Sequence, residues 1–144
     1  MNLSEHFTLE EMIASTAARG TIDNTPTPEI VENLRFLCAR LEEVRNLLGQ
    51  SMIISSGYRC PALNEKVGGA PKSQHMLGLA ADFICPAAGT PLSICRRIDA
   101  SSIRFDQLIY EYTWCHVSFV PANPRREALT LNASTHGYLS GIVG

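Results

Sequence analysis

The sequence predicts an α+β domain in which a small antiparallel sheet has helices packed on one side. Its length of 144 residues is enough for one domain with a hydrophobic core, and 45% hydrophobic with 18% charged residues is ordinary globular composition. The apolar periodicity predicts one long helix and several short strands. The helix spans 28–48, and the strands span 52–56, 80–84, 105–111 and 114–120.

Two helices are predicted in the N-terminal third of the chain. Thr8 and Glu11 form a capping box, so a short helix follows to about Ser15. Thr27 as N-cap and Pro28 at the first helical position begin the long helix, which Gly49 ends. Its apolar residues recur in steps of four and three, as in a helix that packs on a core. They are Ile30, Leu34, Leu37, Leu41, Val44 and Leu48.

The rest of the chain is predicted to alternate strands, loops and short helices. A strand over 52–56 leads into a loop, a short helix over 61–67 follows, and Thr90 with Pro91 begins a helix to about Asp99. A tight turn at 112–113 joins the last two strands. The Ser/Thr/Gly-rich segment from about 122 to 144 is expected to pack loosely, and its His136 to be incidental.

Two histidines and a carboxylate stand out as metal ligands: His75, Asp82 and His116. Seven residues separate His75 from Asp82, which places them about 10 Å apart on a continuous helix and on opposite faces of a continuous strand. A bend at Gly78 would bring them together, with His75 on a loop and Asp82 on the strand 80–84. Strand alternation puts His116 on the mixed face of 114–120, from which it can point into a cleft.

These motifs resemble the zinc D-alanyl-D-alanine carboxypeptidase family, which includes the VanX dipeptidases and phage L-alanyl-D-glutamate endolysins. The resemblance covers roughly residues 3–120 and implies a hedgehog/DD-peptidase fold, one zinc ion, and Arg59 as the residue that holds a substrate carboxylate. It rests on Ser73-x-His75-x-x-Gly78-x-Ala80-x-Asp82, on Trp114-x-His116, and on the upstream stretches Ser56-Gly-Tyr-Arg59 and Leu3 to Glu11, which are similar to the small phage and prophage branch.

Three protein ligands leave a position for water, which is typical of a catalytic rather than a structural zinc site. A general base is also required, and Glu111 is predicted to be that base. In VanX-like relatives the base lies three residues before the last histidine, where this chain has Thr113. Asp106 is the alternative base, although alternation puts it on the other face of the strand. Ser73 either orients a ligand or contacts the substrate, or is a simple turn residue.

The predicted function is therefore hydrolysis of peptidoglycan stem peptides, either as a carboxypeptidase at D-Ala-D-Ala or as an endopeptidase at L-Ala-D-Glu. A second hypothesis is a zinc-bearing binding or virion-assembly module. Two observations give it weight: Thr113 stands where VanX-like relatives have the catalytic base, and no wall-targeting module is visible in the sequence. A third, purely structural histidines, would require coincidence at several motifs.

The charge and composition of the chain exclude some classes of binding partner. A net charge of −2 without a basic cluster argues against nucleic acid, and no apolar run is long enough for a membrane span. The start of the chain does not resemble a secretory signal, so we expect a monomer that is cytoplasmic at synthesis and acts on the cell wall after release. The five cysteines form no C-x-x-C pair and are expected to be buried thiols. Cys115 adjoins His116, but a thiol ligand there would point to the opposite face.

Overall fold

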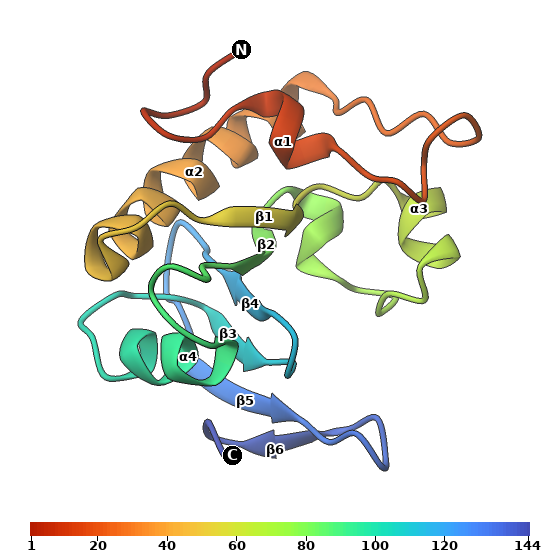
Figure 1. Ribbon diagram of the computed structural model, residues 1–144. Helices are drawn as coiled ribbons and strands as arrows, with labels where there is room; N and C mark the ends of the chain where they lie inside the picture. The colour runs from red at the N-terminus through yellow and green to blue at the C-terminus, as the bar shows by residue number, and fades with distance from the viewer.

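The predicted α+β class is confirmed in a computed structural model that describes residues 1–144 (Figure 1). Six strands form one sheet in the order β1-β2-β4-β3-β5-β6. The strands are β1 (Ile53–Ser56), β2 (Ala80–Ile84), β3 (Gln107–Tyr110), β4 (Cys115–Ser118), β5 (Glu127–Leu131) and β6 (Tyr138–Ser140). The helices are α1 (Leu9–Ile13), α2 (Pro28–Leu48), α3 (Pro61–Lys66) and α4 (Pro91–Asp99), with a 3-10 turn η1 (Gln74–Leu77).

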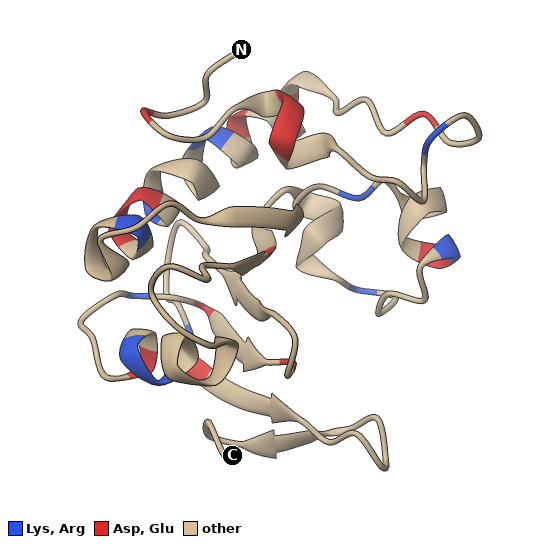
Figure 2. Cartoon of the chain, in the orientation of Figure 1, with Lys and Arg blue, Asp and Glu red and all other residues tan.

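Local signals set the helix boundaries as expected. The Thr8–Glu11 capping box is present at α1, although that helix ends at Ile13. The Thr27 side chain accepts a hydrogen bond from the first turn of α2, and Gly49 ends the helix in the left-handed region with φ of 69°. Acidic and basic residues are interspersed along the outer surface of α2 (Figure 2). Two ion pairs form there between residues three positions apart, Glu32 with Arg35 and Arg40 with Glu43. No helix is sufficiently long and apolar to span a bilayer.

The two faces of the sheet differ because strand side chains alternate. One face packs on α2 and α4 in a core of aliphatic and aromatic side chains, so the helices that form the main core lie on one side as predicted. Cys115 belongs to this face, where its thiol donates to the Pro91 carbonyl of α4. All five cysteines are free, and four of them are buried as expected, whereas Cys60 is only partly buried. The Cys115 thiol points away from the face that carries His116.

The C-terminal segment differs from the prediction. Residues 122–144 were expected to pack loosely, but this is wrong for β5 and β6, which extend the sheet at its edge (Figure 1). β5 pairs parallel with β3, so the sheet is mixed rather than purely antiparallel. Thr130 of β5 is buried and its hydroxyl donates to the Gly141 carbonyl. Backbone hydrogen bonds and this buried hydroxyl order a segment that has little apolar periodicity.

Candidate metal centre and active-site cleft

His75, Asp82 and His116 meet on the face of the sheet opposite the main core, and these three residues are called the metal group below. Asp82 and His116 are direct partners in the antiparallel pairing of β2 with β4, which brings their side chains together. His116 Nδ1 lies 2.8 Å from Asp82 Oδ1, and His75 Nε2 lies 3.2 Å from the same oxygen. One ligand atom from each residue falls within 4.8 Å of the other two. These spacings are close to the roughly 3.4 Å expected between ligands of one tetrahedral zinc ion.

The bend that delivers His75 combines a cap and a glycine. Ser73 caps η1 by accepting a hydrogen bond from the His75 amide at 3.2 Å, so its structural role is to position that histidine. Gly78 ends η1 with φ of 72°, and a Cβ there would lie 3.2 Å from atoms of α2. His75 therefore lies on a 3-10 turn rather than in the irregular loop predicted, but the bend lies at Gly78 as predicted.

The hydrogen bonding of His75 makes the group suitable for a cation. Its Nδ1 lies 2.7 Å from the Gly57 carbonyl, which can only accept, so Nδ1 carries the proton. Burial lowers the pKa of His75, which favours the neutral ring with an unprotonated Nε2. Nε2 and Asp82 Oδ1 are then two acceptors in contact without a proton between them. A metal ion satisfies both, so the donor set fits zinc chemistry.

Asp82 is held in its ionised form. Burial opposes ionisation, but the hydrogen bond with His116 and the adjacent imidazole of His75 outweigh it and keep the pKa of Asp82 well below its usual value. Its second oxygen lies 3.3 Å from Arg59 Nη2. The Arg59 guanidinium also donates to Ser56 Oγ and lies within 3.4 Å of Asn64 Oδ1. Arg59 thus stands beside the metal group, and protein acceptors occupy part of its donor capacity.

Glu111 and Asp106 occupy different environments. Glu111 faces the same cleft as the metal group, and its Oε2 accepts a hydrogen bond from the Trp114 indole at 3.1 Å. Burial raises the pKa of Glu111, and the nearby Asp82 charge raises it further. Asp106 lies outside the cleft lining and is bound by Arg125 through contacts as short as 2.6 Å. This placement favours Glu111 over Asp106 as the proton acceptor.

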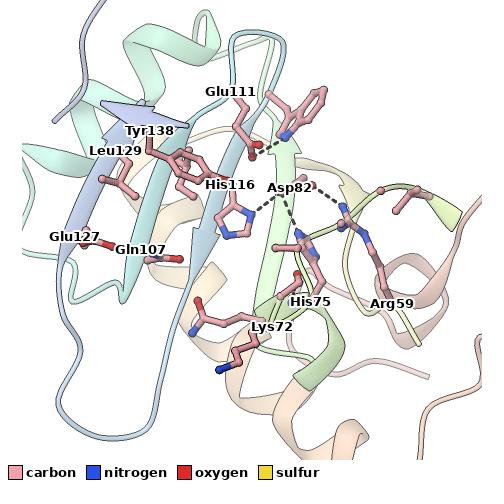
Figure 3. Close-up of a pocket in the computed structure, with 18 of the residues that line it drawn as sticks. Arg59, Lys72, His75, Asp82, Gln107, Glu111, His116, Glu127, Leu129 and Tyr138 are labelled. Atoms are coloured by element: carbon pink, nitrogen blue, oxygen red, sulfur yellow. Dashed lines mark hydrogen bonds and ion pairs between the residues drawn. The ribbon is translucent and has the colours of Figure 1, made fainter. Parts of the chain in front are cut away.

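The metal group lines a cleft of about 680 Å³ (Figure 3). Several other residues line the cleft that were not predicted, and for most of them no local signal exists, because their approach depends on the sheet order and on the loop that precedes η1. Gln107 could have been found, since alternation places it on the same face as Glu111. The residues missed are Lys72, Gln107, Glu127, Leu129 and Tyr138, which Figure 3 labels.

A buried His-Asp-His group in an open cleft, with a carboxylate of raised pKa beside it, is the arrangement of a metal-dependent hydrolase. The sequence profile of the family described as Peptidase M15 matches residues 5–118. The chain belongs to this family, whose members are metallopeptidases, typically zinc-dependent, that act on peptidoglycan. A search among curated proteins found no match.

Proposed function

We propose that the protein is a zinc metallopeptidase that hydrolyses the stem peptide of bacterial peptidoglycan, at D-Ala-D-Ala or at L-Ala-D-Glu. The observation that carries the proposal is the contact between His75 Nε2 and Asp82 Oδ1, two acceptors 3.2 Å apart beside His116 in an open cleft. These three residues would hold one zinc ion. A zinc ion with three protein ligands supplies Lewis acidity that activates water and polarises a carbonyl.

Glu111 is proposed to take the proton of the attacking water and to pass it to the leaving amine. Its Oε2 is held by the Trp114 indole, which leaves Oε1 for the proton. A pKa raised by burial brings the carboxyl group closer to neutrality, where one residue can serve first as base and then as acid.

Arg59 and Lys72 are proposed to attract the carboxylates of the stem peptide. Both line the cleft (Figure 3). The long contacts of Arg59 with Asp82 and Asn64, 3.3 and 3.4 Å, leave room for a bidentate carboxylate to compete. Lys72 takes part in none of the ion pairs of the structure, so its ammonium group is available.

The test is incubation of the zinc-loaded protein with purified peptidoglycan, followed by mass spectrometry of the released fragments. Free D-alanine would identify a carboxypeptidase, and cleavage after L-alanine an endopeptidase. Absence of any product would refute the peptidase proposal and favour the zinc-bearing binding or assembly module. A His116→Ala variant serves as the control, because it removes one member of the metal group.

A further inference from the structure

The wall of the cleft opposite the loop that carries Lys72 comes from a part of the chain beyond the family match. That match ends at residue 118, whereas Glu127, Leu129 and Tyr138 of β5 and β6 line the cleft. The pairing of β5 with β3 places Glu127 beside Gln107 and Leu129 beside Ile109, so the face that bears the metal group continues into β5. The cleft therefore has a wall that the family resemblance does not describe.

Tyr138 is the prominent side chain of this wall. It is the partner of Leu131 in the β5–β6 pairing and so projects to the same face as Leu129. Figure 3 shows its ring between Leu129 and the part of the site that holds Glu111 and His116. Tyr138 is 53% exposed even though it lines the cleft, which leaves its surface available to a ligand.

The chemistry of Tyr138 is that of a hydrogen-bond donor without a partner. Partial burial raises the pKa of its phenol, and the charges of Glu111 and Asp82 raise it further, so the hydroxyl keeps its proton. No protein group hydrogen-bonds to it. Leu129 adds an aliphatic surface beside the ring. Together they offer one polar donor and a small apolar patch, which suit a peptide carbonyl and an alanyl methyl group.

We propose that the β5–β6 hairpin is a substrate-binding wall of this enzyme and that Tyr138 contacts the stem peptide directly. Its hydroxyl donates to a backbone carbonyl of the bound peptide while its ring packs with Leu129 on an alanyl side chain. The inference rests on the proposed function, because it takes the stem peptide as the ligand. It assigns recognition of that peptide to a segment outside the part shared with the family.

Binding can be measured apart from hydrolysis through Trp114, which is the single tryptophan and lines the cleft. The probe is a synthetic stem pentapeptide that contains both candidate bonds, titrated against zinc-loaded protein that carries Glu111→Gln to slow turnover. Added substitutions are Tyr138→Ala and Tyr138→Phe, with Leu139→Ala as the matched control. Leu139 is the next residue of β6 and is 43% exposed, but it does not line the cleft.

We expect Tyr138→Phe to weaken binding about 3- to 10-fold through loss of one hydrogen bond, and Tyr138→Ala to weaken it further. Leu139→Ala should bind like the parent. Equal dissociation constants for all three variants, or no detectable binding to the parent, would overturn the inference. Hydrolysis is followed separately with protein that has the native Glu111. Turnover without a Tyr138 effect refutes only the hairpin role, whereas a Tyr138 effect on binding without turnover refutes only the peptidase proposal.

Discussion

Replacement of Glu111 by Gln separates metal binding from turnover. Glutamine has nearly the same shape and keeps an oxygen that can accept from the Trp114 indole, so the 3.1 Å contact that orients the side chain can persist. It cannot accept the proton of an attacking water. General acid-base catalysis contributes about 10²- to 10⁴-fold, which corresponds to roughly 3–5 kcal/mol of activation free energy. Hydrolysis should therefore fall by a factor of about a hundred or more.

The assay combines zinc analysis of the purified protein with mass spectrometry of peptide products over time. We expect one zinc ion per chain in both the parent and the variant, because Glu111 is not part of the His-Asp-His group. Glu29→Gln is a matched control that removes an exposed carboxylate from the first turn of α2, outside the cleft, and leaves Glu111 in place. Full activity of Glu111→Gln would refute the assignment, and loss of zinc would show that Glu111 supports the metal instead.

The remaining predictions concern removal of the metal, the backbone carbonyl that orients His75, the positive charge of Lys72, and the pH dependence of stability. Removal of metal with a chelator should abolish hydrolysis and lower the melting temperature, and zinc at a hundredfold excess over its dissociation constant should restore about 2.7 kcal/mol, measured by thermal unfolding. Gly57→Ala should reduce zinc affinity by about 10-fold or more, because a Cβ would lie 2.3 Å from a backbone oxygen of α1 and displace the carbonyl that orients a ligand histidine. In a zinc-competition titration Gly137→Ala, which meets no atom closer than 3.5 Å, should match the parent. Lys72→Ala should raise KM for the stem pentapeptide several-fold with little change in kcat, whereas a reduced kcat at unchanged KM would contradict a binding role. Hydrogen bonds from Arg125 lower the pKa of Asp106, so its ionised form stabilises the fold above the unfolded-state value of about 3.9, and this contribution is lost as pH falls below about 4. Asp106→Asn should therefore lower the free energy of unfolding in urea by more at pH 6 than at pH 3, and an equal loss at both would contradict the ion-pair role.

The elements that the sequence predicted well are those with signals inside a few neighbouring residues. Helix α2 begins at Pro28 and ends before Gly49, and α4 spans Pro91–Asp99, because a cap, a proline or a glycine marks these ends. Strand positions were predicted to within two residues by apolar alternation, as for β4. Local chemistry decides these boundaries, so they are readable without knowledge of the fold.

The metal group was predictable for a different reason. His75, Asp82 and His116 have the residue types that bind zinc, and the bend at Gly78 follows from the spacing of the first two. The hydrogen bond from His75 to the Gly57 carbonyl was not predictable, because any residue can supply a carbonyl. The residue types that can bind a metal are identifiable from the sequence. The backbone groups that orient these side chains are not, because they depend on how distant segments pack.

The hairpin β5–β6 marks the limit of local signals and also explains the shape of the cleft. β5 pairs parallel with β3, and such pairing is specified by the tertiary fold rather than by a short turn between the two strands. Tyr138 belongs to a strand whose residues are all exposed, so no burial pattern predicts it. An exposed edge strand gains little stability from side-chain burial, yet it can present side chains to a ligand. Because β6 does not pack on the core, its sequence has no apolar periodicity from which Tyr138 could be predicted. For the same reason the ring and hydroxyl of Tyr138 stay available at the cleft.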